Sequence, residues 1–161
     1  MPSKFVFPGG AIDAGDHAVG HLSAQCKARL MAGGVQLTPE AIAGAALREL
    51  GEETGLRLGA AAHLRFIFRA ITPPGRSRRF DARFLLADAG DIIGDAQDFS
   101  AADQELGHLQ WVPLTKARQL DLPFITEVVL AEVGALARGL DQPGVPFFDN
   151  AGDTPTFRRL G

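Results

Sequence analysis

The amino-acid sequence predicts an α/β (α+β) fold, because helical and strand-like segments alternate along one chain of 161 residues. Two segments, 39–54 and 122–138, have apolar residues at the spacing of three and four that marks a helix packed on one face. Two others, 63–69 and 80–87, are rich in β-prone residues, and a loop with proline and glycine separates them. With 46% apolar residues the chain can bury a core, so we expect a single domain over 1–161.

The segment 39–54 has clear helix signals at both ends. Thr38 can cap its N-terminus, and Pro39 occupies the first helical position. Gly55 follows the last turn, where a left-handed residue is usual. The residues expected to face the core are Ala43, Leu47, Leu50 and Thr54. The opposite face carries the mostly small residues Ile42, Ala45 and Ala46, which leaves room for a ligand to approach.

Three carboxylates lie on one face of this predicted helix. Glu49, Glu52 and Glu53 fall within about 100° of arc, because a helix advances about 100° per residue. Such like charges repel each other unless a cation offsets them. Clusters of carboxylate oxygens are what Mg²⁺ and Mn²⁺ prefer. Three acids alone more often form a solvated acidic face than a metal site, so the flanking residues decide.

The flanking residues resemble a known motif. RELGEETGL, residues 48–56, resembles the second half of the Nudix box, whose pattern is G-x5-E-x7-R-E-U-x-E-E-x-G-U with U apolar. Gly10 and Asp16 resemble the first half at the right spacing. There are two departures. Asp16 stands where the family has glutamate, and residues 17–47 separate it from Arg48 where the pattern has seven residues.

The long separation is itself informative. An insert at this point after an FPGG-x-x-D-x-x-D opening resembles one Nudix subgroup, the peroxisomal coenzyme A diphosphatases and their bacterial relatives. The insert, 17–38, is expected to hold a helix from His17 to Met31, with Asp16 as its cap. His17 and His21 are four residues apart, so they would share a face of it, as a metal pair or as surface residues.

The resemblance implies an α/β/α sandwich with a mixed sheet and a helical insert inside the box. It also implies an enzyme, a Nudix hydrolase that uses a divalent metal ion to cleave a phosphoanhydride bond in a nucleoside-diphosphate-linked small molecule. Coenzyme A or acyl-coenzyme A is the substrate expected from the subgroup. The alternatives are an ADP-ribose or NADH pyrophosphatase and a non-catalytic nucleotide-binding module. The complete REL-x-EE set argues against a module that only binds.

The resemblance also implies roles for individual residues. The implied ligands of Mg²⁺ or Mn²⁺ are the backbone carbonyl of Gly9 and the carboxylates of Glu49, Glu52 and Glu53. Glu49 is a metal ligand or the base that takes the proton of the attacking water, and Glu53 is counted with it among the catalytic groups. Arg48 should hold a neighbouring acid in place, since it lies four residues before Glu52. Asp16 and Glu105 are two further candidates.

A basic loop follows the first predicted strand. Arg76, Arg78 and Arg79 lie between 63–69 and 80–87. The guanidinium fork matches phosphate oxygens, so these side chains suit a phosphorylated substrate. A solubilising loop is the alternative interpretation of the same residues.

The rest of the chain is predicted more simply. Residues 109–112 should form a strand ended by Pro113, and Asp121 should cap the helix 122–138. Residues 141–161 have three prolines and little periodicity, so they are expected to be an irregular tail.

Composition excludes several classes of protein. The net charge of −3 argues against a general nucleic-acid binder. No apolar run approaches the roughly 18 residues of a membrane span, so no membrane partner is expected. The single cysteine, Cys26, cannot form an internal disulfide, which is consistent with a reducing, cytoplasmic location.

The position of the box predicts the state of assembly. Nudix domains usually place strands ahead of the box, whereas only the β-prone run Phe5–Phe7 precedes Gly10 here. We therefore expect an N-terminally truncated form of the fold. A strand edge left uncovered by the truncation would favour a homodimer, because unpaired backbone groups invite pairing.

Overall fold

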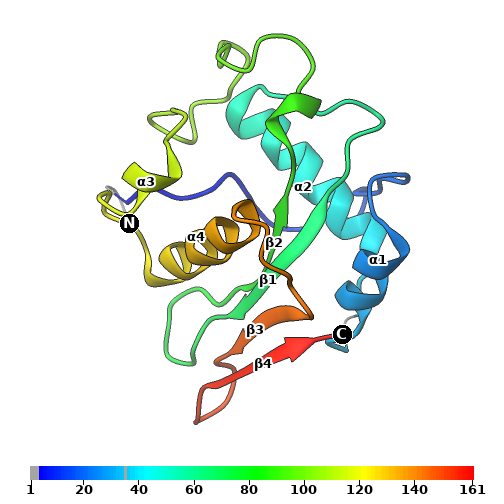
Figure 1. Ribbon diagram of the computed structural model, residues 1–161, viewed down its shortest axis with the longest axis vertical. Helices are drawn as coiled ribbons and strands as arrows, with labels where there is room; N and C mark the ends of the chain where they lie inside the picture. Colours follow the sequence, from blue (N-terminus) through cyan, green and yellow to red (C-terminus); the bar gives the residue numbers. More distant parts are fainter. Residues whose placement is uncertain (1–3, 35) are drawn as a thin grey trace. The chain divides into compact units, whose positions relative to one another are not determined.

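Figure 1 shows the computed structural model of the chain, which describes residues 4–34 and 36–161. Its contacts group the chain into two compact units. The segments of unit 1 are 4–6, 66–85 and 113–161, and those of unit 2 are 7–65 and 86–112. The predicted insert, 17–38, is described except for residue 35. The single domain expected over the whole chain stays a prediction.

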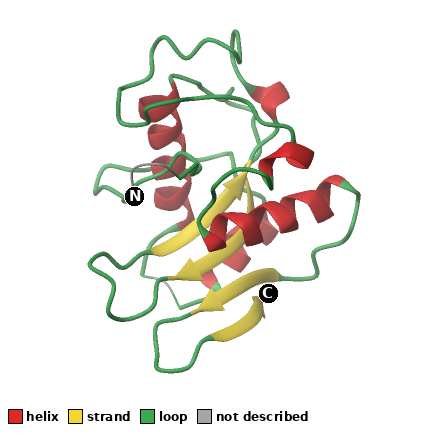
Figure 2. Cartoon of the chain, turned by 90° about the vertical axis from the view of Figure 1, so that its left-hand side faces the viewer, coloured by secondary structure: helices red, strands yellow, loops and turns green. Residues whose placement is uncertain are grey.

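The sheet has four strands. They are β1 (Arg65–Ile71), β2 (Asp81–Leu86), β3 (Val145–Asp149) and β4 (Thr156–Leu160). Their order is β2-β1-β3-β4 (Figure 2). β1 runs parallel to β3, with Arg69 opposite Phe147, and β3 runs antiparallel to β4, with Phe147 opposite Arg158. A mixed sheet together with helices confirms the predicted α/β (α+β) class.

The two predicted strands are present, and one is displaced. The segment predicted at 80–87 forms β2. The strand predicted at 63–69 forms as β1, which begins and ends two residues later than predicted. The backbone N–H of Leu64 donates to the carbonyl of His21 at 2.8 Å instead of joining the sheet, so the start of the strand moves toward the C-terminus. A long-range contact with the insert therefore sets this boundary. In the described residues from Lys4 onward, no strand forms over the β-prone Phe5–Phe7 run.

The prediction of an irregular tail over 141–161 is wrong, because this segment supplies β3 and β4. Gln142 positions the segment: its side-chain amide donates to the carbonyl of Ile67 at 3.0 Å and to Glu132 at 2.8 Å. Periodicity failed here because Pro146 lies within β3, where proline is unusual, and four of the five residues of β4 are exposed.

Helix α4 (Phe124–Ala137) belongs to unit 1, with the short helix α3 (Leu114–Ala117) before it. The predicted helix began at residue 122 with Asp121 as its cap, but the helix starts after Pro123. Asp121 has other partners: its carbonyl accepts from Phe5 N–H at 3.1 Å, and its carboxylate pairs with Lys4 at 3.2 Å.

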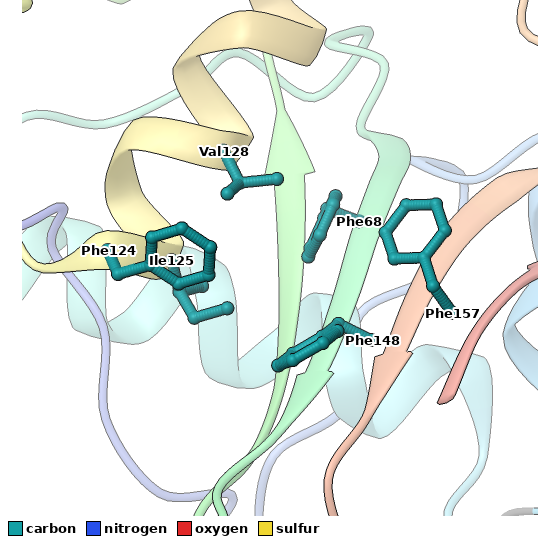
Figure 3. A pocket seen from close by; sticks show the side chains of 6 residues that line it. All are labelled: Phe68, Phe124, Ile125, Val128, Phe148 and Phe157. Carbon is teal, nitrogen blue, oxygen red and sulfur yellow. The ribbon is translucent and has the colours of Figure 1, made fainter. Parts of the chain in front are cut away.

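Aromatic side chains fill the interior of unit 1. Phe66, Phe68 and Phe147 are buried in the sheet. An apolar pocket of about 260 Å³ opens between α4 and strands of the sheet (Figure 3). Its lining residues are Phe68, Phe124, Ile125, Val128, Phe148 and Phe157. These contacts show that α4 lies over the face of the sheet that carries Phe68.

Unit 2 is organised around helix α2 (Pro39–Thr54). The bounds of this helix are the predicted ones. The side chain of Thr38 accepts a hydrogen bond from Ala41 N–H at 3.1 Å, and Gly55 ends the helix with a left-handed φ of 75°. The prediction for its faces is only partly right. Ile42 and Ala45, which were expected on the open face, are buried. No helix in the described part of the chain is both long and apolar enough to cross a membrane.

The insert helix, α1, is shorter than predicted. It spans Ala24–Met31 and begins with Ser23 as its cap, not with Asp16. The backbone is left-handed at Gly20, with φ of 87°, which keeps 17–23 out of the helix. His21 therefore shares no helix face with His17, and its Nδ1 lies 2.8 Å from the carbonyl of Ala62.

The strand predicted at 109–112 does not form. Trp111 is held by its side chain, since its indole N–H donates to the carbonyl of Ala96 at 2.7 Å. Pro113 has no N–H to offer a neighbouring strand, and the helix α3 starts directly after it. The β-prone residues of this segment therefore lie in a loop.

Candidate functional site

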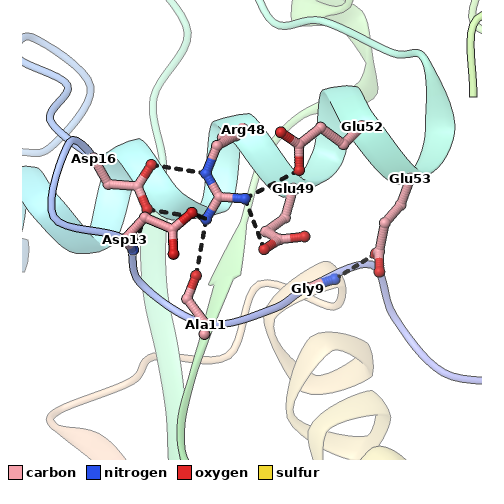
Figure 4. Close-up of polar contacts among 8 residues, drawn as sticks. All are labelled: Gly9, Ala11, Asp13, Asp16, Arg48, Glu49, Glu52 and Glu53. Carbon is pink, nitrogen blue, oxygen red and sulfur yellow. Dashed lines mark hydrogen bonds and ion pairs between the residues drawn. The ribbon is translucent and has the colours of Figure 1, made fainter. Parts of the chain in front are cut away.

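Arg48 is the centre of a polar network in unit 2 (Figure 4). Its Nε and Nη2 donate to the two oxygens of Asp16 at 2.9 and 3.0 Å, which is a bidentate pair. Its Nη1 donates to Glu49 at 2.9 Å and to Glu52 at 3.0 Å. One guanidinium therefore joins the two halves of the motif, although the insert separates them in sequence.

The same arginine fixes the backbone that leads to Asp16. Nη2 of Arg48 donates to the carbonyl of Ala11 at 2.8 Å and lies 3.5 Å from a carboxylate oxygen of Asp13. The Asp13 N–H donates to Asp16 at 2.7 Å. The hydrogen bond from Arg48 lowers the pKa of Asp16, and Asp16 in turn is the main cause of a raised pKa for Arg48. Both groups are thus held in their charged forms.

Two glycines permit this close packing. A Cβ at Gly44, in the middle of α2, would overlap the backbone nitrogen of His17. A Cβ at Gly10 would overlap the carboxylate of Glu49. Only glycine lets the 10–17 backbone pass this close to the helix. Sequence reasoning missed Gly44, because glycine inside a helix usually signals only a loss of stability.

Glu53 lies on the same helix in a different environment. Glu53 is only 4% exposed, and one of its carboxylate oxygens accepts a hydrogen bond from the Gly9 N–H at 2.7 Å. Burial raises the pKa of Glu53; the Gly9 bond opposes the increase, and the nearby charges of Glu49, Glu105 and Asp103 add to it. This carboxylate is therefore surrounded by negative charge and burial, which a bound cation would relieve.

A loop from unit 2 brings the last two acids to the end of the helix. The Asp103 N–H donates to the carbonyl of Glu52 at 2.7 Å, and the Glu105 N–H donates to the carboxylate of Asp103 at 3.0 Å. A Cβ at Gly55 would lie 2.9 Å from the nitrogen of Ala102, so the glycine admits this loop. The loop surrounds a hollow of about 490 Å³ within 99–109. Asp103 was missed by sequence reasoning, since no local pattern sets it apart.

The donor atoms suit a divalent cation by type and by charge. The acids concerned are carboxylates, and Glu53 is buried among other negative groups. Within the described residues, no three His, Cys, Asp or Glu side chains converge closely enough to hold an ion. Arg48 engages an oxygen of Glu49 and one of Glu52, so these carboxylates are oriented by the arginine. Gly9 contributes its N–H to Glu53 in this arrangement.

The basic loop lies in unit 1, whereas the acids lie in unit 2. Arg76, Arg78 and Arg79 are all exposed between β1 and β2. Nη2 of Arg79 is 3.4 Å from the carbonyl of Ala151, in the turn between β3 and β4. The three guanidinium groups are therefore open to solvent.

Comparison with known proteins identifies the family. A model of the NUDIX domain matches residues 22–133, which include the whole of α2 and more than half of the chain. Searches of curated proteins and of solved structures gave no match. The chain therefore belongs to the Nudix family of hydrolases, which cleave pyrophosphate bonds in nucleoside diphosphate derivatives and generally need a divalent metal ion such as Mg²⁺ or Mn²⁺.

Proposed function

We propose that this Nudix hydrolase cleaves the phosphoanhydride bond of coenzyme A or an acyl-coenzyme A. The observation that carries the proposal is the Arg48 network, because it joins Asp16 to the acids of α2 across the long insert. The insert and the FPGG opening are the features that favour coenzyme A over other diphosphates. Asp16 thus takes the place of the family glutamate with its shorter side chain.

Each residue of the network has a distinct proposed role. Glu52 and Glu53 are the metal ligands, with the Gly9 backbone beside Glu53, and Glu49 is a further ligand or the base that accepts the proton of water. A bound divalent ion supplies charge neutralisation of the diphosphate and lowers the pKa of a water molecule. Arg48 is a positioning residue, since it orients Glu49 and Glu52 by charge-assisted hydrogen bonds.

The acids near the end of α2 add to the electrostatics of the site. The charges of Asp103 and Glu105 act on Glu53. We assign Glu105 to the group of acids that can assist the metal or take a proton, because its backbone is tied to Asp103 and Asp103 to the helix end. Their combined charge favours a site that operates with a cation present.

The exposed arginines of the basic loop are proposed to bind phosphate groups of the substrate outside the scissile pair. Arg76, Arg78 and Arg79 are accessible and carry positive charge, and guanidinium groups bind phosphate through two parallel hydrogen bonds. The 3′-phosphate of coenzyme A is such a group.

A panel assay tests the substrate. The full chain is incubated with coenzyme A, acetyl-coenzyme A, ADP-ribose or NADH, each with Mg²⁺ or Mn²⁺, and the products are identified by mass. Cleavage of the coenzyme A compounds within the diphosphate is expected. Faster cleavage of ADP-ribose or NADH would favour the alternative pyrophosphatase, and tight binding without cleavage of any compound would favour a nucleotide-binding module. The Glu53→Gln variant controls for a contaminating hydrolase.

The homodimer and the cytoplasmic location expected from the sequence stay predictions. Light scattering on the purified chain gives its mass in solution. A mass of one chain at micromolar concentration would contradict the homodimer without affecting the proposed activity.

A further inference from the structure

The apolar pocket of unit 1 lies outside the Nudix motif in sequence. Phe68, on β1, is buried and forms the floor of the pocket. Phe124 and Phe157 are 67% and 59% exposed, so their rings lie at its mouth (Figure 3). The remaining lining residues are apolar as well, namely Ile125, Val128 and Phe148. The pocket is therefore an apolar cavity that opens to solvent, and not a closed packing defect.

Such a cavity favours an apolar ligand over water. Apolar side chains offer water no hydrogen bond, so cavities lined by them stay dry and bind apolar molecules. The two exposed rings at the mouth cost free energy in water, and a ligand that covers them recovers it. The volume of about 260 Å³ is just below the range of about 300–1,000 Å³ for sites that take a whole small ligand. The pocket therefore suits one apolar part of a larger molecule.

The basic loop leaves the same end of the sheet as the turn that joins β3 to β4. β1 and β3 are parallel, and their last residues, Ile71 and Asp149, lie opposite each other. The basic loop follows the first of these residues, and the turn follows the second. Nη2 of Arg79 lies 3.4 Å from the carbonyl of Ala151 in the turn. The loop and the turn are therefore in contact.

Two walls of the pocket adjoin this turn. Phe148 and Phe157 lie opposite each other on β3 and β4, one residue inside the last pair of the ladder. The basic loop contains three arginines and no acid, whereas the turn adds two acids, Asp149 and Asp153, so cations outnumber anions in these two segments. An apolar opening thus adjoins a surface with excess positive charge. This combination matches a ligand with one apolar end and one anionic end.

We propose that unit 1 binds the acyl group of an acyl-coenzyme A in the apolar pocket, with phosphate of the coenzyme on the basic loop. The acyl chain supplies the apolar end, and the guanidinium fork matches the phosphate oxygens. The pantetheine arm between them is flexible enough to connect the two. The assignment of the anionic end to coenzyme A rests on the proposed function. The inference makes that function more specific, since an acyl-coenzyme A is then preferred to free coenzyme A.

Calorimetric titration measures how binding depends on chain length. Coenzyme A and its acetyl, butanoyl, hexanoyl, octanoyl and dodecanoyl thioesters are titrated into the full chain with EDTA, so that no turnover occurs. Each methylene that enters the pocket should tighten binding by roughly fourfold at most. Kd should fall at least tenfold from the acetyl to the octanoyl thioester and then level off, because the pocket is finite. Equal affinity for all thioesters, or an undiminished gain per methylene up to dodecanoyl, would overturn the proposal.

Filling the pocket should remove the gain in affinity. Val128→Phe places a ring in the cavity, so the octanoyl thioester should bind no more tightly than the acetyl one, while the Kd of coenzyme A stays unchanged. Val19→Phe is the matched control and should keep the gain, because Val19 is 66% exposed in unit 2. An undiminished gain in Val128→Phe would overturn the proposal. Phe124→Ala removes an exposed ring at the mouth and should reduce the gain about threefold or more. If Val128→Phe does not fold, an undiminished gain in Phe124→Ala overturns the proposal by itself.

Two further measurements distinguish other occupants. Octanoate bound as tightly as octanoyl-coenzyme A would assign the pocket to a free fatty acid and overturn the assignment to a coenzyme A ester. Light scattering that shows a wild-type dimer, dissociated by Val128→Phe or by Phe124→Ala, would assign the pocket to a second copy of the chain instead. Because EDTA prevents turnover, failure of the coenzyme A cleavage assay would not affect the binding result. Cleavage of coenzyme A without any gain from the acyl chain would support the proposed function and overturn this inference.

Discussion

The arginines of the two units differ in the number of acids that surround them. In unit 2, the single guanidinium of Arg48 contacts Asp16, Glu49 and Glu52, so negative charge exceeds positive charge. In unit 1, Arg69 and Arg83 both pair with the carboxylate of Asp81, so two guanidinium groups meet at one acid. The same residue type therefore lies among several acids in one unit and shares a single acid in the other.

The difference shows that the net charge around an arginine depends on how many carboxylates contact it. A carboxylate beside Arg48 is oriented for a ligand that arrives with positive charge. Among the described residues, the buried Nε of Arg83, beside Asp81, has no hydrogen-bond acceptor. The acids around Arg48 are of the type that binds the divalent metal ion that Nudix hydrolases generally need.

The largest effect is expected from removing one charge of the acidic site. Glu52→Gln or Glu53→Gln should lower kcat by about 10²-fold or more, because loss of a ligand weakens a site for a doubly charged ion. Circular dichroism should show an intact fold. Glu40→Gln is the matched control, since Glu40 lies on the same helix but pairs with Lys27. Near-normal turnover of both site variants at saturating metal would remove these residues from the metal site.

A smaller effect is expected from the exposed arginines of the basic loop. Replacing Arg76 and Arg78 with Ala should raise KM for coenzyme A about tenfold relative to its 3′-dephospho form, because a charge-assisted bond contributes roughly 1.5–3 kcal/mol. Arg79 is left in place because it contacts Ala151. Steady-state kinetics on the two substrates measures the ratio. Equal losses on both would show that the loop does not read the 3′-phosphate.

The close approach at Gly44 offers a test of the Arg48 network without touching a charge. Gly44→Ala should displace the backbone at Asp16 and His17, lower kcat several-fold and destabilise the fold by about 1–3 kcal/mol, the usual cost of overpacking. Gly51→Ala, on the same helix, is the control, because its Cβ would meet nothing nearer than 3.9 Å. That variant should be at least as stable as the wild type, since alanine favours helix. Thermal melts and kcat are measured together; matching values for the two variants would contradict the role of Gly44.

The smallest effect is expected in the pH dependence of stability. Burial acts to raise the pKa of Asp81, but the hydrogen bond from Arg69 and the charges of both arginines outweigh it and lower the pKa below 3.8. A carboxyl with a depressed pKa in the folded state stabilises the fold above the unfolded pKa, and this contribution is lost as the pH falls through the folded pKa. Asp81→Asn should therefore cost about 1–2 kcal/mol at neutral pH, a figure reduced for the exposure of Asp81, and flatten the loss of stability below pH 3.8. Urea unfolding at several pH values measures this; parallel curves for both proteins would contradict it.

The helix Pro39–Thr54 and its row of acids follow from local features of the amino-acid sequence. Caps, helical spacing and the REL-x-EE pattern all act within a few residues, so they can be read locally. The same local reading placed β2 correctly. It failed for the helix expected to start at His17, where the backbone is left-handed at Gly20, and for the strand expected at 109–112, where the Trp111 side chain bonds to Ala96.

The partners that these residues meet depend on the folded chain. Asp16 reaches Arg48 because the backbone passes Gly44, and Asp103 reaches the end of α2 because Gly55 admits its loop. The tail became β3 and β4 through pairing with β1 and with each other. Charge balance around a side chain depends on every group within a few ångströms, whatever its place in the sequence. The gathering of acids around Arg48 and the sharing of Asp81 by two arginines therefore emerge only when the chain is folded.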